Sequence, residues 1–158
     1  MIIEAKKDKA LTGAAGAYYV AFRLTAQGYA VGLTTHGTRS IDMVVANPDT
    51  GKSITIQTKT MREAFMPRTK WGPYWKWRVS TKPSLYPKDN AFFYTFVDLA
   101  DDRPKKTPDV FIVPSMQLEP PLIEKYDGDY WCVIYEKDRE KYLDRWDVLR
   151  DALAANMV

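Results

Sequence analysis

The chain has 158 residues, of which 46% are hydrophobic and 27% charged, and its formal net charge is +3. A chain of this length forms one domain with a sizeable hydrophobic core, so we expect a single domain over residues 1–158. No apolar run approaches the roughly 20 residues of a membrane-spanning helix, and the first residues lack the apolar stretch of a signal peptide. The single cysteine, Cys132, excludes an internal disulfide and indicates a reducing compartment. We therefore expect a cytoplasmic protein without a membrane partner.

Residues 9–33 predict a helix followed by a strand. Thr12 is a suitable N-cap residue, and Gly28 is a typical residue for the end of a helix. We expect the helix over residues 13–27, with its small residues packed closely against a sheet, and the strand over residues 29–33. A polar loop over residues 34–40 then leads to the next element.

A hairpin over residues 40–60 is the central feature of the sequence. Residues 41–46 are apolar and rich in β-branched side chains except for Asp42, residues 47–51 are turn formers, and residues 52–60 alternate. Because residues two apart on a strand share a face, Gln57 and Lys59 point the same way, with Asp42 on the neighbouring strand. The hairpin thus predicts a carboxylate, an amide oxygen and an ammonium in one small volume. Such a trio can hold a divalent metal and a water beside a phosphodiester.

The segment after the hairpin combines aromatic and basic side chains. Residues 62–82 contain six basic residues and one acid, so positive charge is concentrated there. Residues 67–73 predict a loop, and residues 74–80 alternate between apolar and basic side chains, which predicts a half-buried strand. Cations on phosphates and rings on unstacked bases bind nucleic acids, but the tryptophans can equally fill the core while the charges are solvated. The candidate nucleic-acid-binding residues are Arg39, Arg62, Arg68, Lys70, Lys76 and Arg78.

The second half of the chain predicts further strands and a terminal helix. Residues 90–99 are almost continuously apolar and predict a central strand. Residues 110–113 and 130–134 predict two more strands, with an irregular segment over residues 115–129. Residues 137–155 predict one helix with a single apolar stripe, formed by Tyr142, Trp146, Leu149 and Leu153. The sequence therefore predicts an α/β fold with a mixed β-sheet flanked by helices.

Asp42 followed by Gln57-Thr58-Lys59 on the next strand resembles the core of the PD-(D/E)XK nuclease superfamily, in its variant with glutamine at the acidic position. The glycines at 13 and 16, the strand at 88–97, the segment 109–114 and the ending 142–149 also resemble this superfamily. The resemblance implies a restriction-endonuclease-like fold, DNA as the substrate and a possible homodimer. It further implies metal-dependent phosphodiester hydrolysis with Asp42, Gln57 and Lys59 as the catalytic residues. Asp42, Gln57 and the Thr58 carbonyl would bind Mg²⁺ or Mn²⁺, and Lys59 would orient or activate the attacking water.

One position departs from the superfamily pattern. Many relatives carry a glutamate directly after the second glycine, where it contributes to the metal site, whereas this chain has Ala17 and no acid from residue 9 to residue 41. Since Mg²⁺ is usually held by one or two carboxylates together with substrate oxygens, Asp42 alone predicts weak metal binding without DNA.

Two other functions therefore stay open beside nuclease activity. One is a catalytically inactive nuclease fold that binds nucleic acid or a protein partner, and the other is a structural or immunity-type protein that does not contact DNA. In the loop before Asp42, His36 can be a general base, a phosphate contact or a plain solvated residue, and Arg39 a phosphate contact or an ion-pair partner.

Overall fold

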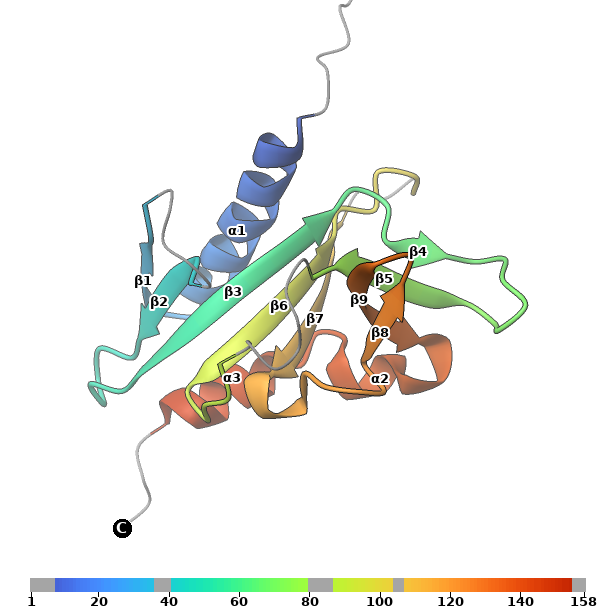
Figure 1. Cartoon of the computed structure of the whole chain (residues 1–158). Coiled ribbons are helices and arrows are strands. Elements are labelled where there is room, and N and C mark those ends of the chain that lie inside the picture. The colour runs from blue at the N-terminus through green and yellow to red at the C-terminus, as the bar shows by residue number, and fades with distance from the viewer. Residues whose placement is uncertain (1–7, 36–40, 80–86, 104–106, 155–158) are drawn as a thin grey trace, which may run out of the picture.

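The computed structural model of the chain describes residues 8–35, 41–79, 87–103 and 107–154. Within these residues the strands form one five-stranded and one four-stranded sheet, with helices packed against the first (Figure 1). The predicted α/β class and mixed sheet are confirmed. None of the described helices is long and apolar enough to cross a membrane.

The five-stranded sheet has the order β1-β2-β3-β6-β7. β3 pairs with β6 in parallel, and the other neighbours pair antiparallel. As predicted, β6 is buried along its whole length. The strands are β1 (Ala30–Leu33), β2 (Met43–Ala46), β3 (Ser53–Met61), β6 (Phe92–Asp98) and β7 (Asp109–Pro114).

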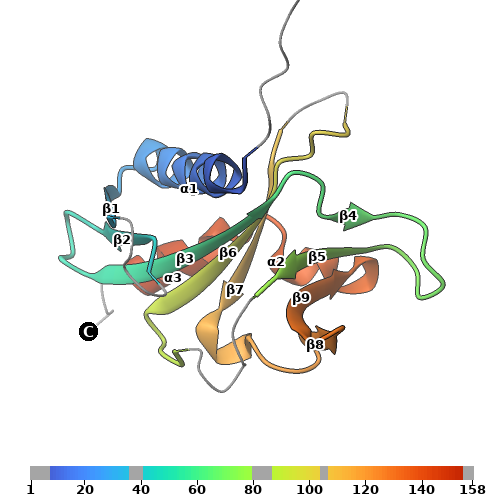
Figure 2. The same ribbon diagram turned by 45° about the horizontal axis from the view of Figure 1, so that its top comes forward.

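Helices α1 (Lys9–Ala26) and α3 (Trp146–Leu153) cover one face of this sheet, as Figure 2 shows. Their buried side chains and those of the sheet form what we call the helix-side core, which includes Val20, Leu24, Ile54, Ile56, Phe93, Val97, Val110, Ile112, Trp146, Leu149 and Leu153.

The start of α1 differs from the prediction. Asp8, and not Thr12, is the N-cap residue, because its carboxylate accepts a hydrogen bond of 2.7 Å from the Ala10 N–H. Thr12 lies one turn inside the helix, where its hydroxyl donates to the Asp8 carbonyl at 2.9 Å. The predicted close packing against the sheet is confirmed at Gly16, where a Cβ atom would lie 1.8 Å from Thr60 Oγ1.

The single terminal helix of the prediction is wrong, because residues 143–145 interrupt it between α2 (Arg139–Tyr142) and α3. Leu143 forms a β-bridge with Phe111, and the Asp144 N–H donates to the Val110 carbonyl at 2.8 Å. Pairing with β7 therefore replaces a helical turn. The predicted apolar stripe is therefore split. Tyr142 packs against a second core, which lies between the two sheets, whereas Trp146, Leu149 and Leu153 pack in the helix-side core.

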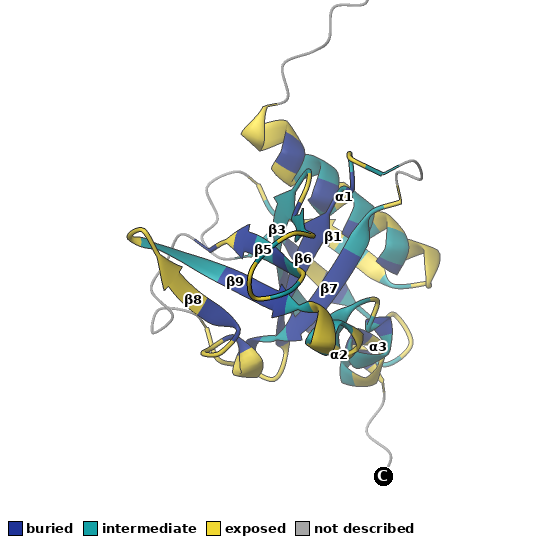
Figure 3. Ribbon diagram, turned by 90° about the vertical axis from the view of Figure 1, so that its right-hand side faces the viewer, coloured by how far each residue is buried: buried dark blue, intermediate teal, exposed yellow. Residues whose placement is uncertain are grey.

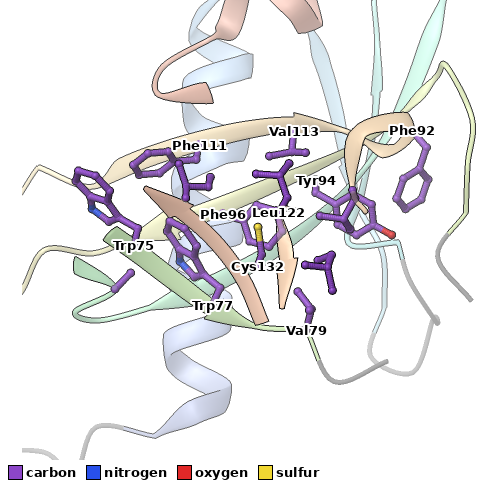
Figure 4. Packing of buried hydrophobic residues seen from close by; sticks show 14 residues of the cluster. Trp75, Trp77, Val79, Phe92, Tyr94, Phe96, Phe111, Val113, Leu122 and Cys132 are labelled. Carbon is purple, nitrogen blue, oxygen red and sulfur yellow. The ribbon is translucent and has the colours of Figure 1, made fainter. Parts of the chain in front are cut away.

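The four-stranded sheet, with the order β4-β5-β9-β8, lies on the opposite face of the first sheet from α1 and α3 (Figure 2). Between the sheets lies a second core, the inter-sheet core, in which the Trp77 ring sits 5.3 Å from that of Phe96 and 5.2 Å from that of Phe111 (Figure 4). Sequence patterns predicted no second sheet. Its strands are β4 (Phe65–Met66), β5 (Tyr74–Arg78), β8 (Ile123–Tyr126) and β9 (Asp129–Tyr135).

β8 lies in the segment that was expected to be irregular. It pairs with β9 through a two-residue turn in which Asp127 and Gly128 have φ angles of 48° and 79°. Asp-Gly with two positive φ angles is the preferred sequence of a type I′ hairpin turn. Asp127-Gly128 is therefore the sequence signal for this hairpin.

Buried polar contacts fix two other parts of the fold. The Asp98 carboxylate is fully buried and accepts hydrogen bonds from the Ala64 N–H at 3.1 Å, the Ala100 N–H at 3.0 Å and Arg103 at 3.0 Å. At the hairpin turn, the Asn47 amide and the Thr50 hydroxyl both donate to the Leu153 carbonyl, at 3.0 and 2.9 Å. The last turn of α3 is thereby attached to the loop between β2 and β3.

Candidate active site

Asp42 lies one residue before β2 and is held by both of its neighbours in the sheet. Its N–H donates to the Ile56 carbonyl at 2.9 Å, and its carbonyl accepts from the Thr34 N–H at 3.0 Å. Its carboxylate Oδ2 accepts the Thr58 N–H at 2.7 Å. The side chain is thus fixed against β3 next to the start of β2, and among the described residues its Oδ1 atom accepts no hydrogen bond.

Gln57 and Lys59 project from β3 on the face of the sheet opposite α1. The alternating Ile54 and Ile56 belong to the helix-side core, so the odd-numbered side chains of β3 lie on the other face. The regular pairing of β2 with β3 begins at Met43, opposite Ile56, and Asp42 adds the contacts of its N–H with Ile56 and of its carboxylate with Thr58. All three candidate catalytic side chains are only half-buried. The structure therefore brings Asp42, Gln57 and Lys59 together on one accessible part of the sheet.

The position of Lys59 changes the pKa of its ammonium group. Burial lowers the pKa of Lys59 from its ordinary value of 10.5, and the nearby negative charge of Asp42 offsets this in part. The two groups are thus electrostatically coupled. A lysine with a lowered pKa gives up or shares its proton more easily, which suits a group that acts on a water molecule.

The residues that could hold a metal at Asp42 would do so through oxygen atoms. Residues of a strand offer their N–H and C=O to the same neighbour, so the Thr58 carbonyl points toward the same edge as the N–H that Asp42 accepts. Asp42 Oδ1, the Gln57 amide oxygen and this carbonyl are the oxygen donors that Mg²⁺ and Mn²⁺ prefer. Among the described residues, no group of three or more histidine, cysteine, aspartate or glutamate side chains is placed to bind a metal. The donor set thus leaves several coordination positions for water or phosphate oxygens.

Helix α1 adds no acid to this site. Its eighteen residues contain neither aspartate nor glutamate, and Ala17 packs against the helix-side core. The departure noted in the sequence therefore leaves Asp42 as the carboxylate of the candidate site.

The described members of the predicted nucleic-acid-binding set have different surroundings. Arg62 pairs with Asp101 at 3.0 Å, and Arg78 pairs with Asp129 at 2.7 Å. Arg68 and Lys70 are exposed on the loop between β4 and β5, and the Lys76 ammonium lies over the Trp131 ring on the outer face of the second sheet. Arg39 and His36 lie outside the described residues.

The tryptophans of β5 resolve an alternative that the sequence left open. Trp75 and Trp77 are buried in the inter-sheet core, whereas Lys76 and Arg78 lie on the other side of the strand. The half-buried strand is confirmed, and these two indoles fill the core rather than face a ligand. Cys132 is buried in the same core, where burial raises the pKa of its thiol, so it is a packing residue.

The fold is similar to that of a homing endonuclease. The solved structure of the bacterial homing endonuclease I-Ssp6803I superposes with a TM-score of 0.59 and 14% sequence identity, over 92% of this chain and 95% of that one. No protein-family model and no curated protein matches the sequence. The restriction-endonuclease-like expectation is therefore supported at the level of a nuclease-like fold.

The perturbed pKa of Lys59 leads to a prediction about stability. Since its folded-state pKa lies below 10.5, the unfolded chain binds more protons between these two values, and stability rises with pH across that window. Lys59→Met removes the buried charge, so we expect this variant to be more stable than the wild type at neutral pH. The difference should shrink as the pH approaches 10.5. Urea denaturation at neutral and alkaline pH measures it.

Lys141 provides the control. Its hydrogen bond to Asp138 raises the pKa of its exposed ammonium, so Lys141→Met is expected to bring no gain in stability at neutral pH. A Lys59→Met variant that is less stable than the wild type at neutral pH would show that the ammonium is a net stabilising group.

Proposed function

We propose that the chain is a metal-dependent endonuclease of the PD-(D/E)XK type that hydrolyses phosphodiester bonds in DNA. The observation that carries the proposal is the convergence of Asp42, Gln57 and Lys59 on one accessible face, at the edge where β2 begins. The similarity of the fold to that of a homing endonuclease supports it. Fold similarity alone does not establish an activity, so the proposal rests on the site residues.

Each residue has a role that follows from its position. Asp42, held by the Thr58 N–H, presents its second carboxylate oxygen, and Gln57 adds a neutral amide oxygen beside it. A bound Mg²⁺ or Mn²⁺ would supply charge neutralisation at the phosphate and a more acidic water. Lys59 orients or activates the attacking water and stabilises the charge that develops on the phosphate oxygens. With a single carboxylate, one metal ion fits this site better than two.

Metal-dependent nicking of supercoiled plasmid tests this proposal. We expect nicked product with Mg²⁺ or Mn²⁺ and none with EDTA. Because the site has one carboxylate and would rely on DNA phosphate to complete the coordination, we also expect weak metal binding without DNA, measured by calorimetry. Equal nicking in EDTA would contradict metal-dependent hydrolysis.

A catalytically inactive DNA-binding protein is the second candidate, and α1 is the observation that favours it. The helix has no acid, so the site lacks a carboxylate that many relatives have. The absence of nicking in either metal, with DNA still bound at low salt and released as salt rises, would support this candidate. The homodimer expected from the resemblance stays a prediction.

A further inference from the structure

The outer face of the second sheet carries aromatic side chains that neither core uses. In β5 and β9 the side chains alternate, with Trp77 and Cys132 pointing inward to the inter-sheet core. The outward positions of β5, β9 and β8 hold rings where the solvent face of an antiparallel sheet normally holds polar residues. These outward rings are Tyr74, Tyr126, Trp131 and Tyr135.

These rings line a hollow of about 590 Å³, which Trp71 borders from the loop between β4 and β5. Trp71 also borders a second hollow of about 460 Å³, together with Pro73, Tyr135, Glu136 and Lys137. Trp71 is 69% exposed and Tyr126 is 74% exposed, and Figure 3 shows β8 at the exposed margin of the molecule. Large exposed rings gathered around a hollow mark a binding surface rather than a packing surface.

Positive charge accompanies the rings. The Lys76 ammonium lies 4.9 Å from the centre of the Trp131 ring, and the Lys70 ammonium lies 4.7 Å from that of Trp71. From residue 64 to residue 78 the chain has four basic residues and no acid. Glu124 is the acid at the hollow, and its carboxylate accepts the Tyr135 hydroxyl at 3.0 Å. The surface thus offers flat rings and neighbouring cations to a ligand that is itself flat and negatively charged.

We propose that this face binds single-stranded DNA, with unpaired bases stacked on Trp71, Tyr126 and the rings between them. Phosphates would lie against Lys70, Lys76 and Arg68. Base stacking on aromatic side chains along a basic groove is the general means by which sheets bind single strands without sequence preference. The surface lies on the far side of the second sheet from the face that bears Asp42 and Lys59. It is therefore a second nucleic-acid site, and its existence does not depend on cleavage.

Fluorescence anisotropy with a short labelled single strand, and with the same strand as a duplex, tests the proposal. The measurement uses EDTA and an Asp42→Asn background, so it needs neither metal nor cleavage. We expect the single strand to bind more tightly than the duplex. Trp71→Ala and Tyr126→Ala should each weaken single-strand binding about ten-fold, since a stacked base contributes on that order. Trp71→Phe, which keeps a ring, should bind nearly as the wild type does.

Tyr18→Ala is the matched control, because Tyr18 is 63% exposed on α1 and lies away from this face. It should leave binding unchanged. The proposal is overturned if the single strand does not bind, or if Trp71→Ala and Tyr126→Ala bind it as tightly as the wild type. These results are separate from plasmid nicking, so the failure of one function does not imply the failure of the other.

Discussion

Lys59→Met and Asp42→Asn are each expected to reduce plasmid nicking by about 10²-fold to 10³-fold or more, which is the scale of losing one charged group at a transition state. Lys59→Met keeps the length of an unbranched side chain but removes the ammonium. Asp42→Asn keeps an oxygen that can accept the Thr58 N–H, so the sheet edge is preserved while the negative charge is lost. Each variant therefore removes a charge from the candidate site with little change in the shape of the side chain. Single-turnover nicking with Mg²⁺ and with Mn²⁺ measures the effect.

Two controls accompany these variants. Asp49→Asn changes an exposed aspartate in the turn of the same hairpin, and Lys141→Met changes an exposed lysine far along the chain. Both should nick at the wild-type rate. If Asp42→Asn and Lys59→Met also nicked at that rate, the activity would belong to other residues or to a contaminating nuclease.

Gly16→Ala is expected to destabilise the fold by about 2 kcal/mol or more, the range found when a group is forced into a packed interior. The added Cβ would lie 1.8 Å from Thr60 Oγ1 and 2.8 Å from Thr60 Cβ. Rotation of the Thr60 side chain relieves the first contact but not the second, so α1 has to move away from β3. Chemical denaturation measures the change in the free energy of unfolding.

Gly13 provides the matched control three residues earlier in the same helix. Apart from neighbouring residues and the backbone of α1 itself, no atom of the described residues lies within 4 Å of a Cβ at Gly13. Gly13→Ala should therefore gain the better helix propensity of alanine, about 1 kcal/mol. Thr60→Ala removes the hydroxyl and methyl groups that Gly16→Ala meets. We therefore expect the double variant to lose less stability than the sum of the single variants. Equal effects of Gly13→Ala and Gly16→Ala would contradict the close packing.

The sequence allowed most of the first sheet to be predicted because its signals are local. The alternation of residues 52–60 and the turn formers at 47–51 define the hairpin, and the almost continuously apolar sequence of β6 indicates a strand buried on both faces. The same alternation places Gln57 and Lys59 on one face. The position of Asp42 beside them follows from the pairing of two adjacent strands, and the Asp42 carboxylate accepts the Thr58 N–H between these two residues.

The second sheet could not be predicted in this way, because its formation depends on pairing between strands that are far apart in the sequence. β5 pairs with β9 more than fifty residues later, and an isolated strand pattern does not tell which sheet it joins. The interruption before α3 has the same origin, since Leu143 pairs with Phe111 on β7 rather than with its helical neighbours. The candidate cations were grouped by sequence proximity, whereas Asp101 and Asp129, distant in sequence, pair with two of them.

The contact between the hairpin turn and α3 has a consequence for the order of events during synthesis. Asn47 and Thr50 bind the Leu153 carbonyl, so the hairpin that carries Asp42, Gln57 and Lys59 gains this anchor only when Leu153 has left the ribosome. Domains fold as they emerge, from the N-terminus onward. A nascent chain that stops short of Leu153 would lack the two hydrogen bonds that hold the β2–β3 loop. The turn of this hairpin thus gains its contact with α3 only late in synthesis.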